Sequence, residues 1–167
     1  LFFAEPNTVV FLDEQSAITE HTFSSIVPEL QLEGMEQFAE NLYFLDSRNG
    51  EIFKSSMKQL TLERWLDPLS PKKPINARSW GIDGNIWILT TENEIQRYFK
   101  GRYQESLNLE IFPQLQGATL LKTNSQLPNL YILDPQEGRI VILSKSGEVV
   151  RQYQSEALKQ VRDFRVS

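Results

Sequence analysis

The stretch Leu130-Tyr131-Ile132-Leu133-Asp134-Pro135-Gln136-Glu137-Gly138-Arg139-Ile140-Val141-Ile142-Leu143 decides the fold of this chain. Two short apolar runs, 130–133 and 139–143, flank a polar segment that contains proline and glycine. Runs of this length, bounded by such residues, are typical of two β-strands joined by a turn. A third run, 148–153, follows a Lys-Ser-Gly turn and mixes apolar with polar residues, as expected of an outer strand. The segment therefore predicts an antiparallel meander.

The first run of this stretch has three earlier copies, which are spaced 41, 44 and 44 residues apart. Each copy is four apolar residues, usually including an aromatic one, and in three of the four a carboxylate follows. A period near forty residues indicates a repeat architecture. The four copies are Leu1-Phe2-Phe3-Ala4-Glu5, Leu42-Tyr43-Phe44-Leu45-Asp46, Ile86-Trp87-Ile88-Leu89-Thr90 and Leu130-Tyr131-Ile132-Leu133-Asp134.

Each earlier repeat has the same order of strands. The predicted second and third strands of these repeats are 9–12 and 17–23, 51–54 and 60–66, and 95–99 and 103–109. A further strand precedes each later repeat and is clearest at 77–82. Residues 161–166 resemble that strand in sequence. Arg162 matches Arg78, and Phe164 matches Trp80, each at a spacing of 84 residues. Pairing of 161–166 beside residues 1–5 would close a ring.

Four-stranded units of 40 to 45 residues in series are typical of β-propeller blades. We therefore predict an all-β fold, a β-propeller of about four blades, each a four-stranded antiparallel meander. The chain is expected to be a single domain, residues 1–167. Its blade units are roughly 1–30, 31–75, 76–117 and 118–160, followed by a closing or next-blade strand at 161–167.

The repeat at 129–149 resembles the NHL type of propeller repeat, in which an apolar strand ends in Asp and is followed by an Arg-Ile pair and a glycine turn. The repeat at 42–54 has part of this pattern, and the other two depart from it. NHL-like propellers usually have six blades. The resemblance thus implies a portion of a larger ring, an unusual four-bladed ring, or copies that associate. It also implies a binding platform, although some related rings are metal-dependent hydrolases.

Composition narrows the choice of partners. The 167 residues include 17 basic and 22 acidic side chains, a net charge of −5, which argues against a nucleic-acid partner. The apolar runs are far shorter than the roughly 18 to 20 residues that cross a bilayer, so we expect no membrane insertion. There is no cysteine, and the chain starts at Leu1 without an initiator methionine, so we expect the natural protein to continue upstream. Localisation stays open; divergent bacterial propellers of this kind often form extracytoplasmic parts of membrane-attached proteins.

Few residues point to catalysis. The carboxylates Glu5, Asp46 and Asp134 recur at strand ends, where they are expected to accept backbone hydrogen bonds and hold the turn rather than bind a metal. His21 is the only histidine and falls in an alternating, outer strand. No nucleophile, phosphate-binding or metal motif occurs. We therefore expect no catalytic residue, no metal and no cofactor, and a protein that is more readily a binding module than an enzyme.

The candidate binding residues lie on predicted inner strands and connectors. Arg78 and Arg162 occupy matching places on inner strands and could hold a carboxylate or phosphate. Trp80 lies beside Arg78, although a wedge in the core is the more common role of tryptophan. The proline-rich loop 67–74 joins two blades and carries two lysines. The predicted binding residues are Arg48, Lys72, Lys73, Arg78, Trp80 and Arg162.

These observations favour a noncatalytic module, a sensor or binding propeller that contacts a protein or a small ligand through its interblade loops. Self-association through blade edges is a second expected interaction. The alternative is a metal-dependent hydrolase of the lactonase type. RNA binding, as in some NHL-like rings, would need a basic face that a chain of net charge −5 has to build from a few residues.

Overall fold

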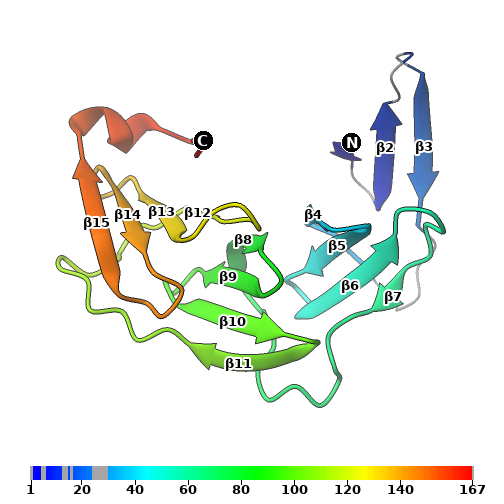
Figure 1. Ribbon diagram of the computed structural model, residues 1–167, viewed down its shortest axis with the longest axis horizontal. Coiled ribbons are helices and arrows are strands. Elements are labelled where there is room, and N and C mark those ends of the chain that lie inside the picture. The colour runs from blue at the N-terminus through cyan, green and yellow to red at the C-terminus, as the bar shows by residue number, and fades with distance from the viewer. Residues whose placement is uncertain (1, 5–6, 13–14, 16, 24–29, 167) are drawn as a thin grey trace. The chain divides into compact units, whose positions relative to one another are not determined.

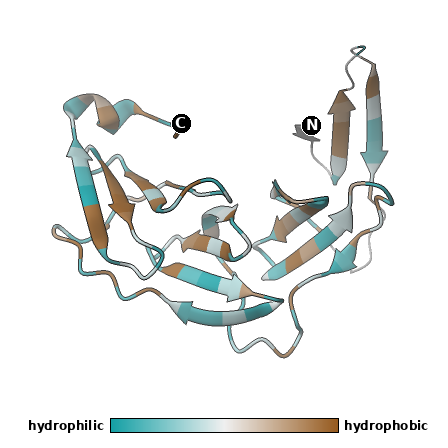
Figure 2. Ribbon diagram, in the orientation of Figure 1, coloured by the Kyte–Doolittle hydropathy of each residue, from teal (hydrophilic) through white to brown (hydrophobic). Residues whose placement is uncertain are grey.

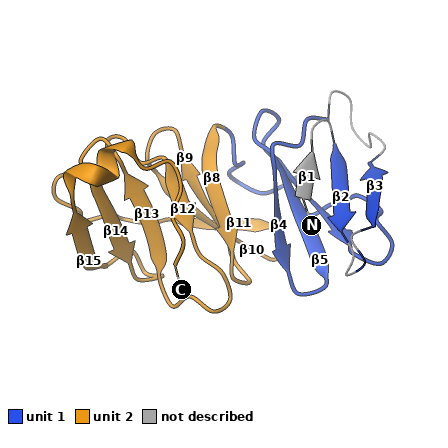
Figure 3. Cartoon of the chain, turned by 90° about the horizontal axis from the view of Figure 1, so that it is seen from above, with its two compact units in different colours: residues 1–75 blue, residues 76–167 orange. Residues whose placement is uncertain are grey.

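The computed structural model describes residues 2–4, 7–12, 15, 17–23 and 30–166, and it is almost entirely β (Figure 1). Apolar residues gather in the middle strands of its sheets (Figure 2). The chain divides into two compact units, residues 1–75 and residues 76–167 (Figure 3). No helix in the described part is long and apolar enough to span a bilayer.

The first unit contains two antiparallel sheets. One has the order β1-β2-β3 and is formed by β1 (Phe2–Ala4), β2 (Thr8–Leu12) and β3 (Ile18–Thr22). The other has the order β4-β5-β6-β7 and is formed by β4 (Gly34–Phe38), β5 (Asn41–Asp46), β6 (Glu51–Ser56) and β7 (Glu63–Arg64). Strands that follow one another in the chain are neighbours, so both sheets are meanders.

The second unit repeats the same order twice. Its first sheet is formed by β8 (Ala77–Ile82), β9 (Ile86–Thr90), β10 (Ile95–Phe99) and β11 (Arg102–Ser106). Its second sheet is formed by β12 (Leu120–Lys122), β13 (Leu130–Asp134), β14 (Arg139–Leu143) and β15 (Val149–Gln154). A short 3-10 helix, η1 (Glu156–Gln160), follows, and the side chain of Ser155 accepts the backbone N–H of Ala157 at its start.

Each unit has its own core between its two sheets. In the first unit the core is formed by Val9, Phe23, Leu32, Leu42, Phe44, Phe53 and Leu62. In the second it is formed by Trp87, Leu89, Ile95, Leu107, Ile111, Ala118, Leu121, Leu130, Ile132, Val141 and Leu143. Every residue of β9 is buried, whereas every residue of β15 is exposed. The second strands of the three four-stranded sheets, β5, β9 and β13, are thus largely covered on both faces, which explains their apolar runs.

The inner strands β8 and β12 pack against each other in the second unit. The Ser79 hydroxyl accepts the backbone N–H of Leu121 at 2.9 Å and donates to the Leu121 carbonyl at 3.2 Å. Gly81 lies so close to Thr123 that an added Cβ would meet the Thr123 backbone at 3.2 Å. Close approach of the first strands of successive sheets is the arrangement that radial repetition of blades requires.

The predicted all-β, four-repeat meander is confirmed, although the first sheet has three described strands where four were predicted for each blade, and two further details differ. The strand expected at 60–66 is reduced to two residues, because Leu60 adopts a left-handed φ of 50°, which a strand does not accommodate. Residues 161–166 make no ladder hydrogen bonds in the described structure, but they lie against β12, since Asp163 pairs with Lys122 at 2.6 Å. Their pairing with residues 1–5 stays a prediction, because residues 1, 5 and 6 lie outside the described part.

Candidate functional site

The loops of each sheet gather at its two ends. In an antiparallel meander, the turn between the second and third strands lies at the same end as the connector that leaves the fourth strand. We call this end of each sheet the connector end. In the second unit it comprises residues 91–94 and 107–119 for one sheet, and 135–138 and 155–160 for the other.

A left-handed residue recurs in the turn that follows β1, β5, β9 and β13, which are the strands formed by the four copies of the first apolar run. Asn7, Gly50, Asn93 and Gly138 have φ values of 56°, 63°, 63° and 62° and follow one another at intervals of 43 or 45 residues. Asparagine and glycine are the residues that adopt this conformation most readily.

Where this residue is asparagine, its side chain holds the connector. The Asn93 carboxamide oxygen accepts the backbone N–H of Ala118 at 3.1 Å. The Asn7 oxygen likewise accepts the backbone N–H of Leu32 at 3.1 Å, and the Asn7 amide donates to the Leu30 carbonyl at 3.3 Å. In both repeats, therefore, the asparagine side chain accepts a backbone N–H of the connector.

Where this residue is glycine, the connector lies directly on it. A Cβ on Gly50 would be 2.7 Å from Ile75 and 2.9 Å from Lys73. A Cβ on Gly138 would be 2.9 Å from the Ser155 carbonyl and 3.1 Å from the Lys159 side chain. All four repeats thus fix their connectors against the same turn, so the loops of the connector end are held by the scaffold.

The strand-end carboxylates support the same turns. Asp46 accepts the backbone N–H of Asn49 at 3.0 Å and that of Gln31 at 3.3 Å, as the sequence predicted. Asp134 instead forms a fully buried ion pair with Arg139, at 2.9 Å. The Arg139 guanidinium also donates to the carbonyls of residues 113 and 114, which belong to the connector. Glu5 lies outside the described residues.

Two cavities open at the connector end of the second unit. One, of about 160 Å³, lies between the turn of the first sheet and its connector, and is lined by Glu92, Asn93, Leu109, Ile111, Gln114 and Leu115. The other, of about 630 Å³, has the corresponding place on the second sheet, and is lined by Thr119, Pro135, Lys159, Gln160, Val161 and Arg162. A further cavity of about 400 Å³ lies between β12 and residues 163–166.

Three of the predicted binding residues belong to the first unit, and all three are at its connector end. Arg48 is exposed in the turn between β5 and β6. Lys72 and Lys73 lie in the connector after β7 and are partly buried. Lys73 forms an ion pair with Glu51 at 2.8 Å, which ties the connector to the start of β6.

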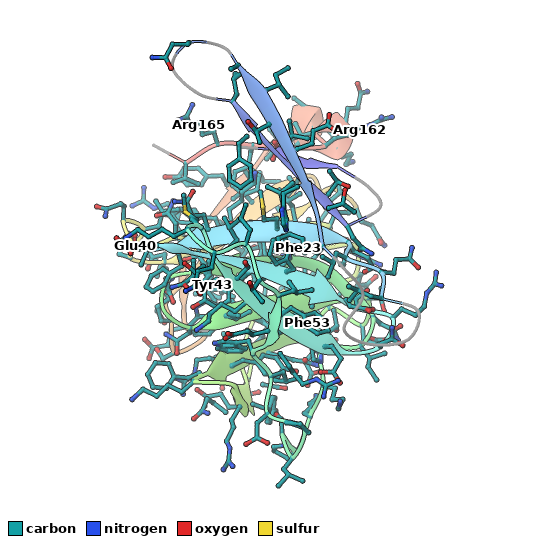
Figure 4. All side chains as sticks on the ribbon, turned by 90° about the vertical axis from the view of Figure 1, so that its right-hand side faces the viewer. Phe23, Glu40, Tyr43, Phe53, Arg162 and Arg165 are labelled. Carbon is teal, nitrogen blue, oxygen red and sulfur yellow. The ribbon has the colours of Figure 1, made fainter. Side chains whose placement is uncertain are left out.

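The other three belong to the second unit and have different surroundings. Arg78 on β8 donates to the Ala118 carbonyl at 2.6 Å, so its guanidinium is engaged in holding the next sheet. Trp80 is half-buried on the same strand, whereas Trp87 is buried in the core, which is the more common role of tryptophan. Arg162 is exposed on the C-terminal segment, as is Arg165 (Figure 4). Arg162 is the member of the six that lines the 630 Å³ cavity.

The opposite end of the second unit holds an ionic network that sequence reasoning missed. Asp83 pairs with Lys145 at 2.5 Å and accepts the Trp87 indole N–H at 3.1 Å. Burial alone would raise the pKa of Asp83, but Lys145 and the donors of Asn85 and Trp87 lower it below its usual value. Because Lys145 belongs to the second sheet and Asp83 to the first, the network joins the two sheets.

Groups suited to catalysis are sparse in the described structure. His21 lies on β3 and contacts Phe23 edge to face, with ring centroids 4.9 Å apart. Within the residues that the structure describes, no three His, Cys, Asp or Glu side chains gather as a set able to hold a metal ion.

Comparison with solved structures identifies the class of the fold. The chain is similar to apo AztD from Citrobacter koseri, with a TM-score of 0.59 and 11% identity over 89% of this chain and 42% of that one. It is also similar to glutaminyl cyclase from Myxococcus xanthus, with a TM-score of 0.54 and 15% identity over 90% of this chain and 69% of that one. The computationally designed Ika8 protein matches with a TM-score of 0.58 and 13% identity over 90% of this chain and 47% of that one.

The chain is therefore a protein of β-propeller type, with four repeats of antiparallel meander. It spans less than half the length of the AztD chain that it matches. No protein family matches the sequence, and no curated protein does. Since these neighbours include an enzyme by name, the fold by itself does not choose between binding and catalysis.

Sequence reasoning found the loops of the site but missed much of its lining. Thr119, Lys159 and Gln160 line the larger cavity and were not singled out. A usable signal did exist, since asparagine or glycine recurs in every turn at an interval of 43 or 45 residues. This recurrence marks the point where each connector is held.

Proposed function

We propose that this chain is a noncatalytic binding module, a propeller of NHL-like type, that binds a protein or a small ligand through its connector ends. One observation carries the proposal: two cavities recur at corresponding places on successive sheets, each between the turn of a sheet and the connector that leaves it. Ligand sites are typically concave and largely preformed. A connector that is already fixed to the scaffold loses little entropy on binding.

The charges at the connector ends support the same proposal. Arg48 and Lys72 extend from loops of the first unit that correspond to those lining the cavities of the second. A protein with net charge −5 that places cations on these loops has a local surface for an acidic partner. Self-association is a further part of the proposal, since residues 161–166 make no ladder bonds in the described structure and unpaired edges invite strand pairing.

The test is a paired comparison on a printed array of defined acidic, basic and neutral peptides and oligosaccharides. The variant Arg48→Gln/Lys72→Gln removes two charges from the connector end. The control Lys58→Gln/Lys100→Gln removes two charges from turns at the opposite ends of the sheets. We expect saturable binding of at least one array member, weakened by the first variant and unchanged in the control. Absence of binding, or an equal effect of the two variants, would contradict the proposal.

The alternative to the proposed binding function is a metal-dependent hydrolase. Lactone hydrolysis is measured with calcium, manganese or zinc added, beside metal analysis of the purified chain. Stoichiometric metal together with turnover that a chelator abolishes would establish the enzyme. Light scattering during gel filtration measures self-association in the same samples, and a strictly monomeric mass would overturn that part.

A further inference from the structure

The larger cavity of the second unit presents hydrogen-bond donors with little negative charge. Its lining combines Arg162, Lys159, Gln160 and Thr119, whose side chains carry hydrogen-bond donors, with the apolar Pro135 and Val161. Its volume of about 630 Å³ lies within the roughly 300 to 1,000 Å³ of sites for small ligands. No carboxylate is part of the lining, whereas Glu92 lines the corresponding cavity of the preceding sheet.

Arg162 has a counterpart whose partner is known. Arg78, which matches Arg162 in sequence at a spacing of 84 residues, lies on β8 and donates to the Ala118 carbonyl at 2.6 Å. Among the described residues Arg162 has neither a hydrogen bond nor an ion pair, so its five N–H donors are open to a ligand.

Lys159 supplies a second positive charge, which is held only by a weak ion pair at the surface. Its side chain lies over Gly138, where an added Cβ would be 3.1 Å from Cγ and 3.3 Å from Cε. The missing glycine side chain thus leaves room for the lysine stem. The Lys159 ammonium pairs with Glu156 at 2.9 Å, but both side chains are largely exposed, at 46% and 88%. Such surface pairs are weak and screened by salt, so a ligand can compete for the ammonium.

From this arrangement we propose that the cavity binds a carboxylate, with Arg162 as the bidentate donor and Lys159 as the second cation. The planar guanidinium matches the two oxygens of a carboxylate, and the pair of charge-assisted bonds fixes its orientation. The ligand class is a molecule with an acidic group, such as an acidic side chain of a peptide. This inference rests on the proposed binding function and names the ligand class of one of its cavities.

The experiment is a titration of the ¹⁵N-labelled chain, followed by amide and arginine Nε–H shifts. The probes are N-acetylglutamate, inorganic phosphate and the neutral N-acetylglutamine amide. We expect saturable shifts at residues 159–162 with N-acetylglutamate, and none with the neutral probe. Arg162→Gln should weaken binding at least about tenfold, and Arg162→Lys should fall between, because it keeps the charge but loses the bidentate geometry.

Arg165→Gln is the matched control, since it removes an exposed arginine three residues away that lines a different cavity. Its affinity for N-acetylglutamate should equal that of the parent chain. The inference would be overturned if the Arg162→Gln variant bound N-acetylglutamate as tightly as the parent chain does, or if the neutral probe bound. Binding of phosphate as tight as that of N-acetylglutamate would overturn the assignment to a carboxylate. Because the array test uses Arg48 and Lys72, its outcome separates failure of the proposed function from failure of this site.

Discussion

Replacing Arg139 by methionine removes five hydrogen bonds that the Arg139 guanidinium donates in the second unit. Its guanidinium donates twice to one oxygen of Asp134, at 2.9 and 3.1 Å, and once to the Gln152 side chain at 2.9 Å. It also donates to the Pro113 carbonyl at 2.7 Å and to that of Gln114 at 3.1 Å. Methionine keeps much of the apolar stem but none of these donors.

The expected loss of stability follows from the burial of the Asp134–Arg139 ion pair. The side chains of Asp134 and Arg139 are 0% and 2% exposed, so the variant leaves a carboxylate in the interior without its cation. Breaking a buried pair on one side costs about 3–5 kcal/mol. The connector carbonyls lose their donors as well, at a net cost that overlaps with this one. We therefore expect about 4 kcal/mol, a large part of the roughly 5–15 kcal/mol by which such domains are stable.

The assay is urea unfolding followed by tryptophan fluorescence, since Trp87 is buried in the core of the same unit. With a slope of about 1–3 kcal/mol per molar urea, the midpoint should fall by more than about 1 M. Arg151→Met, on the exposed strand β15, is the control and should stay within about 0.5 kcal/mol. The double variant Asp134→Leu/Arg139→Met should recover part of the loss. A loss below about 1 kcal/mol in Arg139→Met, or no recovery in the double variant, would refute the reasoning.

Three further predictions concern the turns and the ionic network. Gly50→Ala should lower stability by about 1–3 kcal/mol in thermal unfolding, because φ is 63° and the new Cβ would be 2.7 Å from Ile75; an unchanged melting temperature would exclude the close contact. Asn93→Ala should cost about 1 kcal/mol more than Asn93→Gly, since both lose the carboxamide but only glycine tolerates the left-handed turn; equal stabilities would contradict this. The lowered pKa of Asp83 means that its pair with Lys145 stabilises the fold above the ordinary aspartate pKa of about 3.9, and that this contribution disappears as the pH falls through the lower, folded-state value. The Asp83→Asn variant should therefore lose less free energy of unfolding than the parent chain as the pH falls from about 5 to about 2. An equal loss in the two proteins would show that other carboxylates cause the pH dependence.

Strands with a strong local signal were predictable from sequence. The run at 130–133 and its partner at 139–143 appear as β13 and β14 with a difference of one residue. Both are bounded by turn residues that act over three or four positions, so no distant contact is needed to place them. By contrast, β4 has only scattered apolar residues in its Gly-Met-Glu-Gln-Phe sequence. Its bounds depend on pairing with β5, which local propensity does not encode.

The candidate site was predictable only to the level of its loops. Arg78 and Arg162 match in sequence, yet one is engaged with the Ala118 carbonyl and the other lines a cavity. The difference depends on which groups surround each guanidinium in the folded structure, which is a tertiary property. The connector after β15 forms the short helix η1. That this helix carries Lys159 over Gly138 depends on a contact between residues 21 positions apart, which local sequence does not encode.

The recurring left-handed turn explains how one scaffold can carry different sites. The turn residue holds the connector by a carboxamide in two repeats and by close packing on glycine in the other two. With the connector fixed in this way, neighbouring positions do not have to serve the fold and are open to other chemistry. The two cavities show the result, since Glu92 lines one while Lys159 and Arg162 line the other. The charge of each cavity is therefore set by a few loop residues, and specificity can differ between blades without any change in the strands that support them.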